Sequence, residues 1–154
     1  AIARLDKFRN ADGTRKTSEI RLAMQKTMQT HAAVFRTGDT MSAGIEKLKD
    51  VQASLSDVQV SDRSLVWNTD LIETMELDNL LMQAAATIHG ALNREESRGG
   101  HAREDFPDRD DAKWHKHSLM WVDKKADVTI DYRPVHMYTL TDEVEMVPPR
   151  KRVY

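Results

Sequence analysis

The sequence predicts a mainly α-helical protein: a three-helix antiparallel bundle, a polar loop, a short two-stranded β element and an extended C-terminal tail. Three observations support this fold class. Apolar residues recur at three- and four-residue steps up to about residue 94. A strongly charged stretch at residues 93–111 then interrupts the pattern. After it come short runs that are rich in β-forming residues.

We expect one structural domain with three parts. The helical bundle occupies residues 1–97, a charged interface loop residues 98–113, and a β-hairpin with its tail residues 114–154. A chain of 154 residues suits one domain of ordinary size, and 40% hydrophobic residues allow a modest core.

The first nine residues carry a short apolar stripe that predicts a helix, which ends before Gly13. This helix has no capping residue at its start. The chain also begins at Ala1 and not at Met. We therefore expect it to be a processed product or a piece of a longer protein.

Three longer helices follow, each with a candidate N-terminal cap. The caps are Thr17 or Ser18 for the first helix, Thr40 or Ser42 for the second, and Asp70, with Glu73 completing a capping box, for the third. The third helix is the most apolar, so we expect it at the centre of the bundle. Short connections between the helices predict antiparallel neighbours.

The C-terminal part reads as two strands and a tail. Residues 114–122 and 128–132 form the predicted strands, residues 124–127 connect them, and Pro134 ends the second strand. Residues 137–154 show no strong period, so we expect an extended tail that lies on a surface.

Composition excludes several classes of protein. The formal net charge is −2, which gives no electrostatic reason to expect nucleic acid as a partner. The absence of cysteine excludes disulfides and Cys-ligated clusters in this chain. No apolar run approaches the roughly 18 to 20 residues of a membrane span. No glycine-rich GxGxxG motif follows a predicted strand, so no dinucleotide-binding unit is visible.

The charged stretch is either a flexible linker or a loop whose charges are paired. Positive and negative residues alternate closely in it, and Phe106 and Pro107 lie inside the run as possible anchors. Linkers are normally rich in Ser, Gly and Glu and nearly free of aromatic residues. We therefore favour a paired loop, with ion pairs to Arg98, Arg103 and Arg109.

The sequence offers two candidate metal sites. His115 and His117 share one face of a predicted strand and could bind a metal together with His101, but no carboxylate at ligand spacing completes the set. A calcium loop would need a Gly at the turn and a closing Glu, and the loop has neither at the right spacing. We expect no metal. The four acidic residues of that candidate calcium loop are Asp105, Asp108, Asp110 and Asp111.

Several stretches resemble, in register, the C-terminal domain of the succinate dehydrogenase flavoprotein subunit, to which fumarate reductase flavoproteins are similar. The stretches are 67–74 (WNTDLIET), 97–107 (SRGGHAREDFP), 110–111 (DD), 114–119 (WHKHSL), 132–135 (YRPV) and 147–154 (VPPRKRVY). One departure is Gly100, where the family usually has Ala. Another is the basic run at residues 150–152.

The resemblance implies a parent enzyme that converts succinate to fumarate and passes electrons through FAD and an iron–sulfur subunit to quinone. In the family, FAD and the catalytic residues belong to a preceding flavin-binding domain. We therefore expect no cofactor and no catalytic residue in this chain. The resemblance also implies a peripheral location, at the cytoplasmic face of a bacterial inner membrane or on the matrix side in mitochondria.

By itself, this chain is expected to be a structural contact module. Its implied partners are the flavin-binding domain of the same subunit, the iron–sulfur subunit and, as a further candidate, a flavinylation or assembly factor. The loop residues expected at the contact are Arg98, His101, Arg103, Glu104 and Asp105. Two alternatives stay open: a stand-alone interaction or assembly subunit without catalysis, and, ranked last, a small metal-dependent enzyme that uses the three loop and strand histidines.

Overall fold

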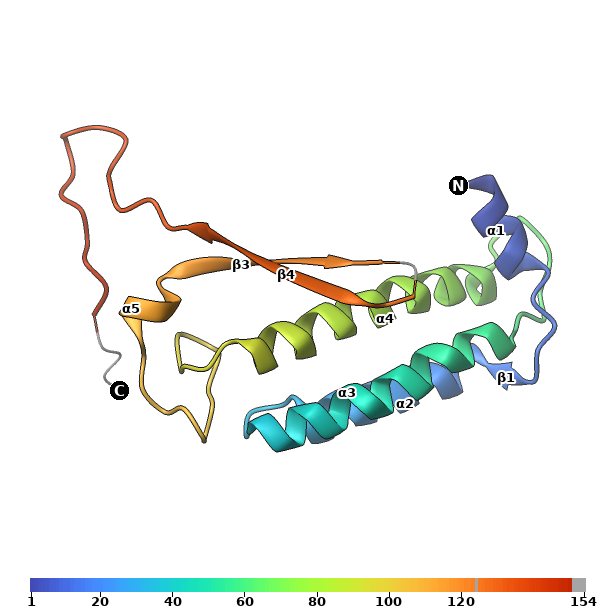
Figure 1. Cartoon of the computed structure of the whole chain (residues 1–154). Coiled ribbons are helices and arrows are strands. Elements are labelled where there is room, and N and C mark those ends of the chain that lie inside the picture. The colour runs from blue at the N-terminus through green and yellow to red at the C-terminus, as the bar shows by residue number, and fades with distance from the viewer. Residues whose placement is uncertain (124, 151–154) are drawn as a thin grey trace.

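A computed structural model describes residues 1–123 and 125–150 of the chain and confirms the mainly α-helical class. Figure 1 shows the helices stacked side by side, with a β-hairpin along one of them. The elements are α1 (Ile2–Arg9), β1 (Arg15–Lys16), α2 (Thr17–His31), α3 (Gly38–Ala53), the short 3₁₀ helix η1 (Ser54–Asp57), β2 (Val58–Gln59), α4 (Thr69–Asn93), α5 (Asp111–Trp114), β3 (Lys116–Val122) and β4 (Val128–Pro134).

The three long helices pack against one another, and α4 also contacts α1 and the hairpin. Successive long helices run in opposite directions (Figure 1). Their apolar faces meet in one core, whose fully buried side chains include Ile20, Met41, Leu48, Leu77 and Ile88. Each such side chain contributes about 1.5–3 kcal/mol by leaving water. The 25-residue α4 is the longest described helix and lies between the α2–α3 pair and the hairpin.

The starts of α2 and α3 differ from the predicted caps. Thr17 is the first residue of α2, but its hydroxyl lies 2.6 Å from the Thr74 hydroxyl of α4, a buried contact between two helices. Helix α3 starts earlier than predicted, because Thr37 is its N-cap. The Thr37 hydroxyl accepts from the Thr40 N–H at 3.2 Å, and the Thr40 hydroxyl accepts from the Thr37 N–H at 3.0 Å. These two reciprocal bonds form a capping box.

The predicted cap of α4 is wrong. Asn68 is the N-cap, and its side-chain oxygen accepts from the Leu71 N–H at 2.8 Å. Asp70 lies inside the first turn, and its carboxylate accepts from the Ser61 N–H at 2.7 Å. Asp70 therefore ties the preceding loop to the helix start, where its negative charge is also favourable for the helix dipole.

The hairpin forms close to where the alternation predicts it. Its antiparallel register pairs Lys116 with Pro134 and Val122 with Val128. Trp114 was predicted in a strand, but it ends α5 and is buried. Lys124, in the predicted connection, lies outside the described residues. The two-residue parallel pair β1–β2 was not predicted, because such short strands show no periodicity.

The segment after the hairpin is irregular over residues 137–150. It is mostly exposed and projects past the end of the hairpin (Figure 1). The Arg150 carbonyl accepts a hydrogen bond from the Arg109 guanidinium. The rest of the basic run, Lys151 and Arg152, lies outside the described residues. Over the described part of the chain, no helix combines the length and apolar character needed to cross a membrane.

Candidate functional site

The charged loop folds back onto the end of α4 around one buried carboxylate. Glu96 is fully buried. Arg94 donates to its Oε1 at 2.6 Å, Arg98 donates to both of its oxygens at 2.8 and 3.0 Å, and the Asp110 N–H donates to Oε2 at 2.9 Å. Burial by itself raises the pKa of Glu96, but the hydrogen bonds from Arg98, Asp110 and Arg94 outweigh it and hold the pKa below its usual value.

A second buried charge connects two helix ends. Arg103 is 3% exposed, and its Nη1 donates to the carbonyl oxygens of Leu92 and Ala91 at 2.9 and 3.3 Å, in the last turn of α4. Its Nε and Nη2 donate to the two oxygens of Asp105, each at 2.7 Å. The Asp105 carboxylate also accepts from the Gly38 N–H, the first of α3, at 2.7 Å.

This arrangement places charges where the helix dipoles favour them. The Arg103 guanidinium lies at the C-terminus of α4, and the Asp105 carboxylate lies at the N-terminus of α3. Hydrogen bonds from Arg103, then the bond from the Gly38 N–H, lower the pKa of Asp105 to about 2 although partial burial opposes the shift. The loop thus connects the two helix ends through paired charges, as the paired-loop prediction expects, with further ion pairs from Asp111 to Arg98 and Arg109.

His101 is held in one neutral form. Its Nδ1 lies 3.2 Å from Nη1 of Arg36, which can only donate, so Nδ1 accepts. Its Nε2 therefore carries the proton and donates to the Arg94 carbonyl at 3.0 Å. Burial, and then the charges of Arg36, Arg103 and Arg94, lower the pKa of His101, while the bond to the Arg94 carbonyl opposes them. Both ring nitrogens of His101 therefore have hydrogen-bond partners within the domain.

Ser97 and Glu104 complete the loop in opposite ways. The Ser97 hydroxyl donates to the Phe106 carbonyl at 2.8 Å and accepts from the Arg103 N–H at 2.9 Å, so it serves as a loop clamp and not as a nucleophile. The Glu104 backbone N–H donates to the Arg36 carbonyl at 2.9 Å. Its side chain is exposed and forms no ion pair with any described residue.

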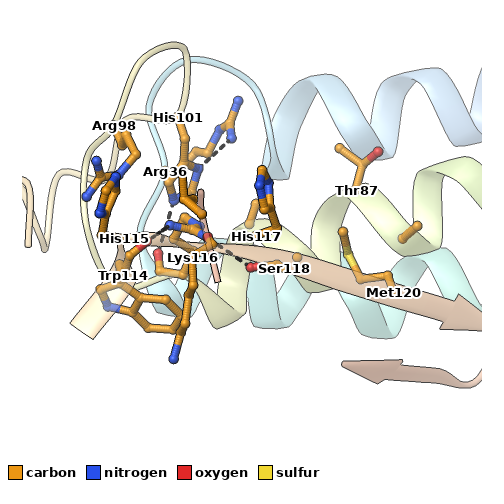
Figure 2. Close-up of a pocket in the computed structure, with 15 residues that line it drawn as sticks. Arg36, Thr87, Arg98, His101, Trp114, His115, Lys116, His117, Ser118 and Met120 are labelled. Atoms are coloured by element: carbon orange, nitrogen blue, oxygen red, sulfur yellow. Dashed lines mark hydrogen bonds between the residues drawn. The ribbon is translucent and has the colours of Figure 1, made fainter. Parts of the chain in front are cut away.

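Next to the loop lies an open pocket of about 630 Å³, between α4, α5 and β3 (Figure 2). None of the described side chains that line the pocket is a carboxylate. They do include four cations and three imidazoles, namely Arg36, Arg94, Arg98, Lys116, His101, His115 and His117.

Two of the four pocket cations have no acidic partner in the described chain. Arg94 and Arg98 are neutralised by Glu96 and Asp111. Arg36 instead binds the neutral His101 ring, and the Lys116 ammonium lies 3.8 Å from the Tyr132 ring centroid. The pocket is therefore chemically suited to an anionic group.

The sequence analysis predicts five residues at the contact, and the structure places all five within one loop. They are Arg98, His101, Arg103, Glu104 and Asp105. Over the described residues, no three His, Asp or Glu side chains are grouped so that they could hold a metal ion.

Arg36, Arg94, Glu96 and Lys116 were missed. Arg36 lies 65 residues from His101 in the chain, so no local sequence pattern could predict their contact. The buried Glu96 is one of many charges in its stretch, and its burial follows only from the folding of the loop. The cluster of basic residues could have been noticed from the Lys and His residues at 115–117.

Comparison with known proteins places these features in a family. The family described as "Fumarate reductase flavoprotein C-term" matches residues 21–154. The mitochondrial succinate dehydrogenase [ubiquinone] flavoprotein subunit of Oryza sativa is 57% identical over 154 residues, covering 99% of this chain and 24% of that protein. The succinate dehydrogenase flavoprotein subunit of Rickettsia conorii is 51% identical over 153 residues, covering 99% of this chain and 26% of that protein.

The fold agrees with this assignment. A solved structure of a variant of the E. coli quinol fumarate reductase FrdA matches with a TM-score of 0.85 and 35% identity, over 99% of this chain and 25% of that one. The chain thus spans about a quarter of the length of the curated relatives it matches. It belongs to the succinate dehydrogenase and fumarate reductase flavoprotein family, of which it forms the C-terminal domain.

Proposed function

We propose that the complete protein is a succinate dehydrogenase flavoprotein subunit, which oxidises succinate to fumarate and passes electrons through an iron–sulfur subunit to quinone. The identities support the dehydrogenase direction. Succinate dehydrogenase subunits from Rickettsia and rice are 49–57% identical to this chain, whereas the fumarate reductase flavoprotein subunit of Mycobacterium tuberculosis is 34% identical.

In this proposal FAD belongs to the part of the subunit outside this chain. FAD would accept the hydride that leaves succinate. The Gly99-Gly100 pair does not form a site for its phosphates, because the pair follows the C-terminus of α4, where carbonyl groups and not N–H groups are free. We therefore assign no catalytic and no cofactor-binding residue to this chain.

The role proposed for this chain is structural, and the cationic pocket without a carboxylate is the observation that carries it. Two of its cations, Arg36 and Lys116, have no acidic partner in the described chain, and burying or covering an unpaired charge is unfavourable. An acidic side chain of the flavin-binding domain, entering this pocket, would pair with them. The iron–sulfur subunit and an assembly factor are further candidate partners.

The five loop residues have different roles in this proposed contact. Arg103 and Asp105 hold the loop to the ends of α4 and α3, so they act as positioning residues. Arg98 and His101 line the pocket. Glu104 presents an unpaired carboxylate to the outside, where it would meet a basic group of the partner.

Glu104→Gln in the full-length subunit tests this role, because Glu104 contributes no side-chain interaction to the described fold. We expect less bound flavin and less assembly with the iron–sulfur subunit, while thermal unfolding of the domain stays unchanged. Glu95→Gln is the matched control, since Glu95 pairs with the exposed Lys113 on the outside of the same loop. Normal flavin content, assembly and activity in both Glu104→Gln and Arg98→Gln would contradict the proposed contact.

We also propose a peripheral position for the assembled complex, at the cytoplasmic face of a bacterial inner membrane or on the matrix side in mitochondria. The support is that the relatives include bacterial flavoprotein subunits and a mitochondrial one. Fractionation of cells into soluble, salt-washed and integral membrane proteins tests this. The subunit should remain with membranes through its partner chains and leave them when those partners are removed.

A further inference from the structure

The loop that leads into α4 carries an apolar surface at the opposite end of the helix from the charged loop (Figure 1). Leu65, Val66 and Trp67 are exposed by 63%, 73% and 95%, and Ile72 on the first turns of α4 by 55%. We call these four residues the Trp67 patch. Three consecutive large apolar residues in water are unfavourable for a free domain, and such patches mark interaction sites.

Hydrogen bonds from Asn68 fix the backbone of the loop that carries the patch. Asn68 is 7% exposed, and its amide donates to the carbonyl oxygens of Asp62 and Ser64 at 2.6 and 2.9 Å while its oxygen caps α4. Trp67 has a φ of 52°, a left-handed conformation that is rare for a bulky residue. A local strain of this kind persists only where surrounding contacts enforce it. The exposure of the indole is therefore built into the loop.

A groove lies beside the patch. It encloses about 540 Å³, and its apolar lining includes Leu5 of α1, Leu65, Trp67 and Leu71. Glu73 and Glu76 also line it, and both form ion pairs with Arg21, at 4.0 and 3.6 Å. An aromatic residue next to an apolar groove is typical of the centre of a binding interface, so the expected occupant is a segment with an apolar anchor.

We infer that the occupant of the Trp67 patch is the preceding part of the same polypeptide. This inference rests on the proposal that the chain belongs to a longer flavoprotein. In the curated relatives the matched region is 24–26% of the length and is the C-terminal one, so about three quarters of the polypeptide precede it. That part would join α1, whose Leu5 forms one wall of the groove.

The covalent connection favours this occupant over any separate molecule. A tethered segment is present at a high effective concentration beside the groove, so even weak apolar contacts would keep it bound. The parent subunit would then contact this domain at both ends of α4: through the Trp67 patch at its start and through the cationic pocket at its end.

The test measures how fast a cysteine in the patch reacts with a maleimide. This chain has no cysteine, so Val66→Cys is introduced into the full-length subunit after its other accessible cysteines have been replaced. Leu65→Cys is a second variant in case the first disturbs the loop. In the isolated, monomeric subunit we expect labelling of the native protein to be at least about tenfold slower than labelling of the same variant in urea. Leu140→Cys, at a residue that is 97% exposed in this domain, checks that the reagent labels native protein.

Three outcomes would overturn the inference. Equal rates in native and unfolded subunit would mean that nothing covers the patch. Slow labelling only in the assembled complex would assign the patch to another chain, and slow labelling only at concentrations where the subunit dimerises would assign it to a second copy. The proposed succinate oxidation is measured separately, so an active subunit that labels quickly at position 66 would refute this inference alone.

Discussion

Single residues show that the most charged stretch of the chain is also part of its interior. Glu96 and Arg103 are among the least exposed side chains of the protein. A buried charge is tolerated only when partners compensate for the lost water. Here three donors surround Glu96, and a carboxylate and helix carbonyls surround Arg103. These residues stabilise the loop from within, before any partner binds.

Arg103→Met should be strongly destabilising. The substitution leaves the Asp105 carboxylate and the last carbonyls of α4 without their donor. Breaking a fully buried pair costs about 3–5 kcal/mol. The expected loss is smaller than this, because the Asp105 side chain is 32% exposed and keeps its hydrogen bond from the Gly38 N–H. Urea unfolding of the full-length subunit, followed by a signal from this domain, measures the loss.

Lys113→Met is the control for that loss. Lys113 pairs with Glu95 at 2.6 Å, but both side chains are about half exposed. Exposed pairs contribute about 0–1 kcal/mol. Similar effects of the two substitutions would show that Arg103 is not the structural centre of the loop.

Asp105 gives the fold a dependence on acid. Its pKa in the folded protein is about 2, below the ordinary value of 3.8, chiefly because of Arg103. A carboxylate with a lowered pKa stabilises the fold fully above its ordinary pKa, and the contribution disappears as the pH falls through the folded-state pKa. The difference in unfolding free energy between wild type and Asp105→Asn should therefore be largest near neutral pH. It should shrink as the pH falls from about 5 to about 2. A difference that stays constant over this range would contradict the assignment.

Among the elements, α4 organises the molecule. It contributes to the core along its length, receives the capping side chain of Asn68 at its start and that of Arg103 at its end, and supports the hairpin. Close approach to its neighbours depends on small residues. A Cβ on Gly44 of α3 would lie 2.8 Å from Cδ1 of Ile88 and 2.4 Å from Cβ of His31.

Gly44→Ala should therefore destabilise the bundle although alanine favours helices. The gain in helix propensity is about 1 kcal/mol. Overpacking of a filled core costs about 1–3 kcal/mol, so the expected net change is a loss of up to about 2 kcal/mol. Thermal unfolding of Gly44→Ala measures it. Gly100→Ala is the matched control, because no atom lies within 4 Å of the added methyl group, and its unfolding should be unchanged. A Gly44 variant as stable as this control would contradict the packing argument.

The whole molecule has two chemically different surfaces at the two ends of α4, and we propose both as contacts. One is the cationic pocket beside the charged loop, and the other is the apolar Trp67 patch. A domain that only had to be stable alone would need neither. Together with a length of about a quarter of its relatives, they support the proposal that this domain is part of a larger protein.

The size of the native polypeptide separates this view from a stand-alone interaction or assembly subunit. An antibody against this domain should detect, in cell extract, a band several times larger than 17.6 kDa that copurifies with flavin. A band near 17.6 kDa would favour the separate subunit, and the search would turn to the flavin-bearing chain to which it binds.

The sequence was sufficient for the helical class, the hairpin and the family. Each of these depends on patterns within a few residues: apolar spacing for the helices, alternation for the strands, and contiguous motifs such as residues 97–107 for the family. The pairing of loop charges was also predictable, because opposite charges lie within two or three residues of each other.

The choice of partners required the tertiary fold. Whether Asn68 or Asp70 caps α4, which acid of the loop is buried, and that Arg36 meets His101 all depend on how distant segments pack. The same holds for Trp67. A large apolar residue of this type would be expected in the core, but its backbone conformation leaves the indole exposed to water. Local periodicity encodes which face of an element is apolar, whereas packing of one element on another sets which side chains meet and which remain for a partner.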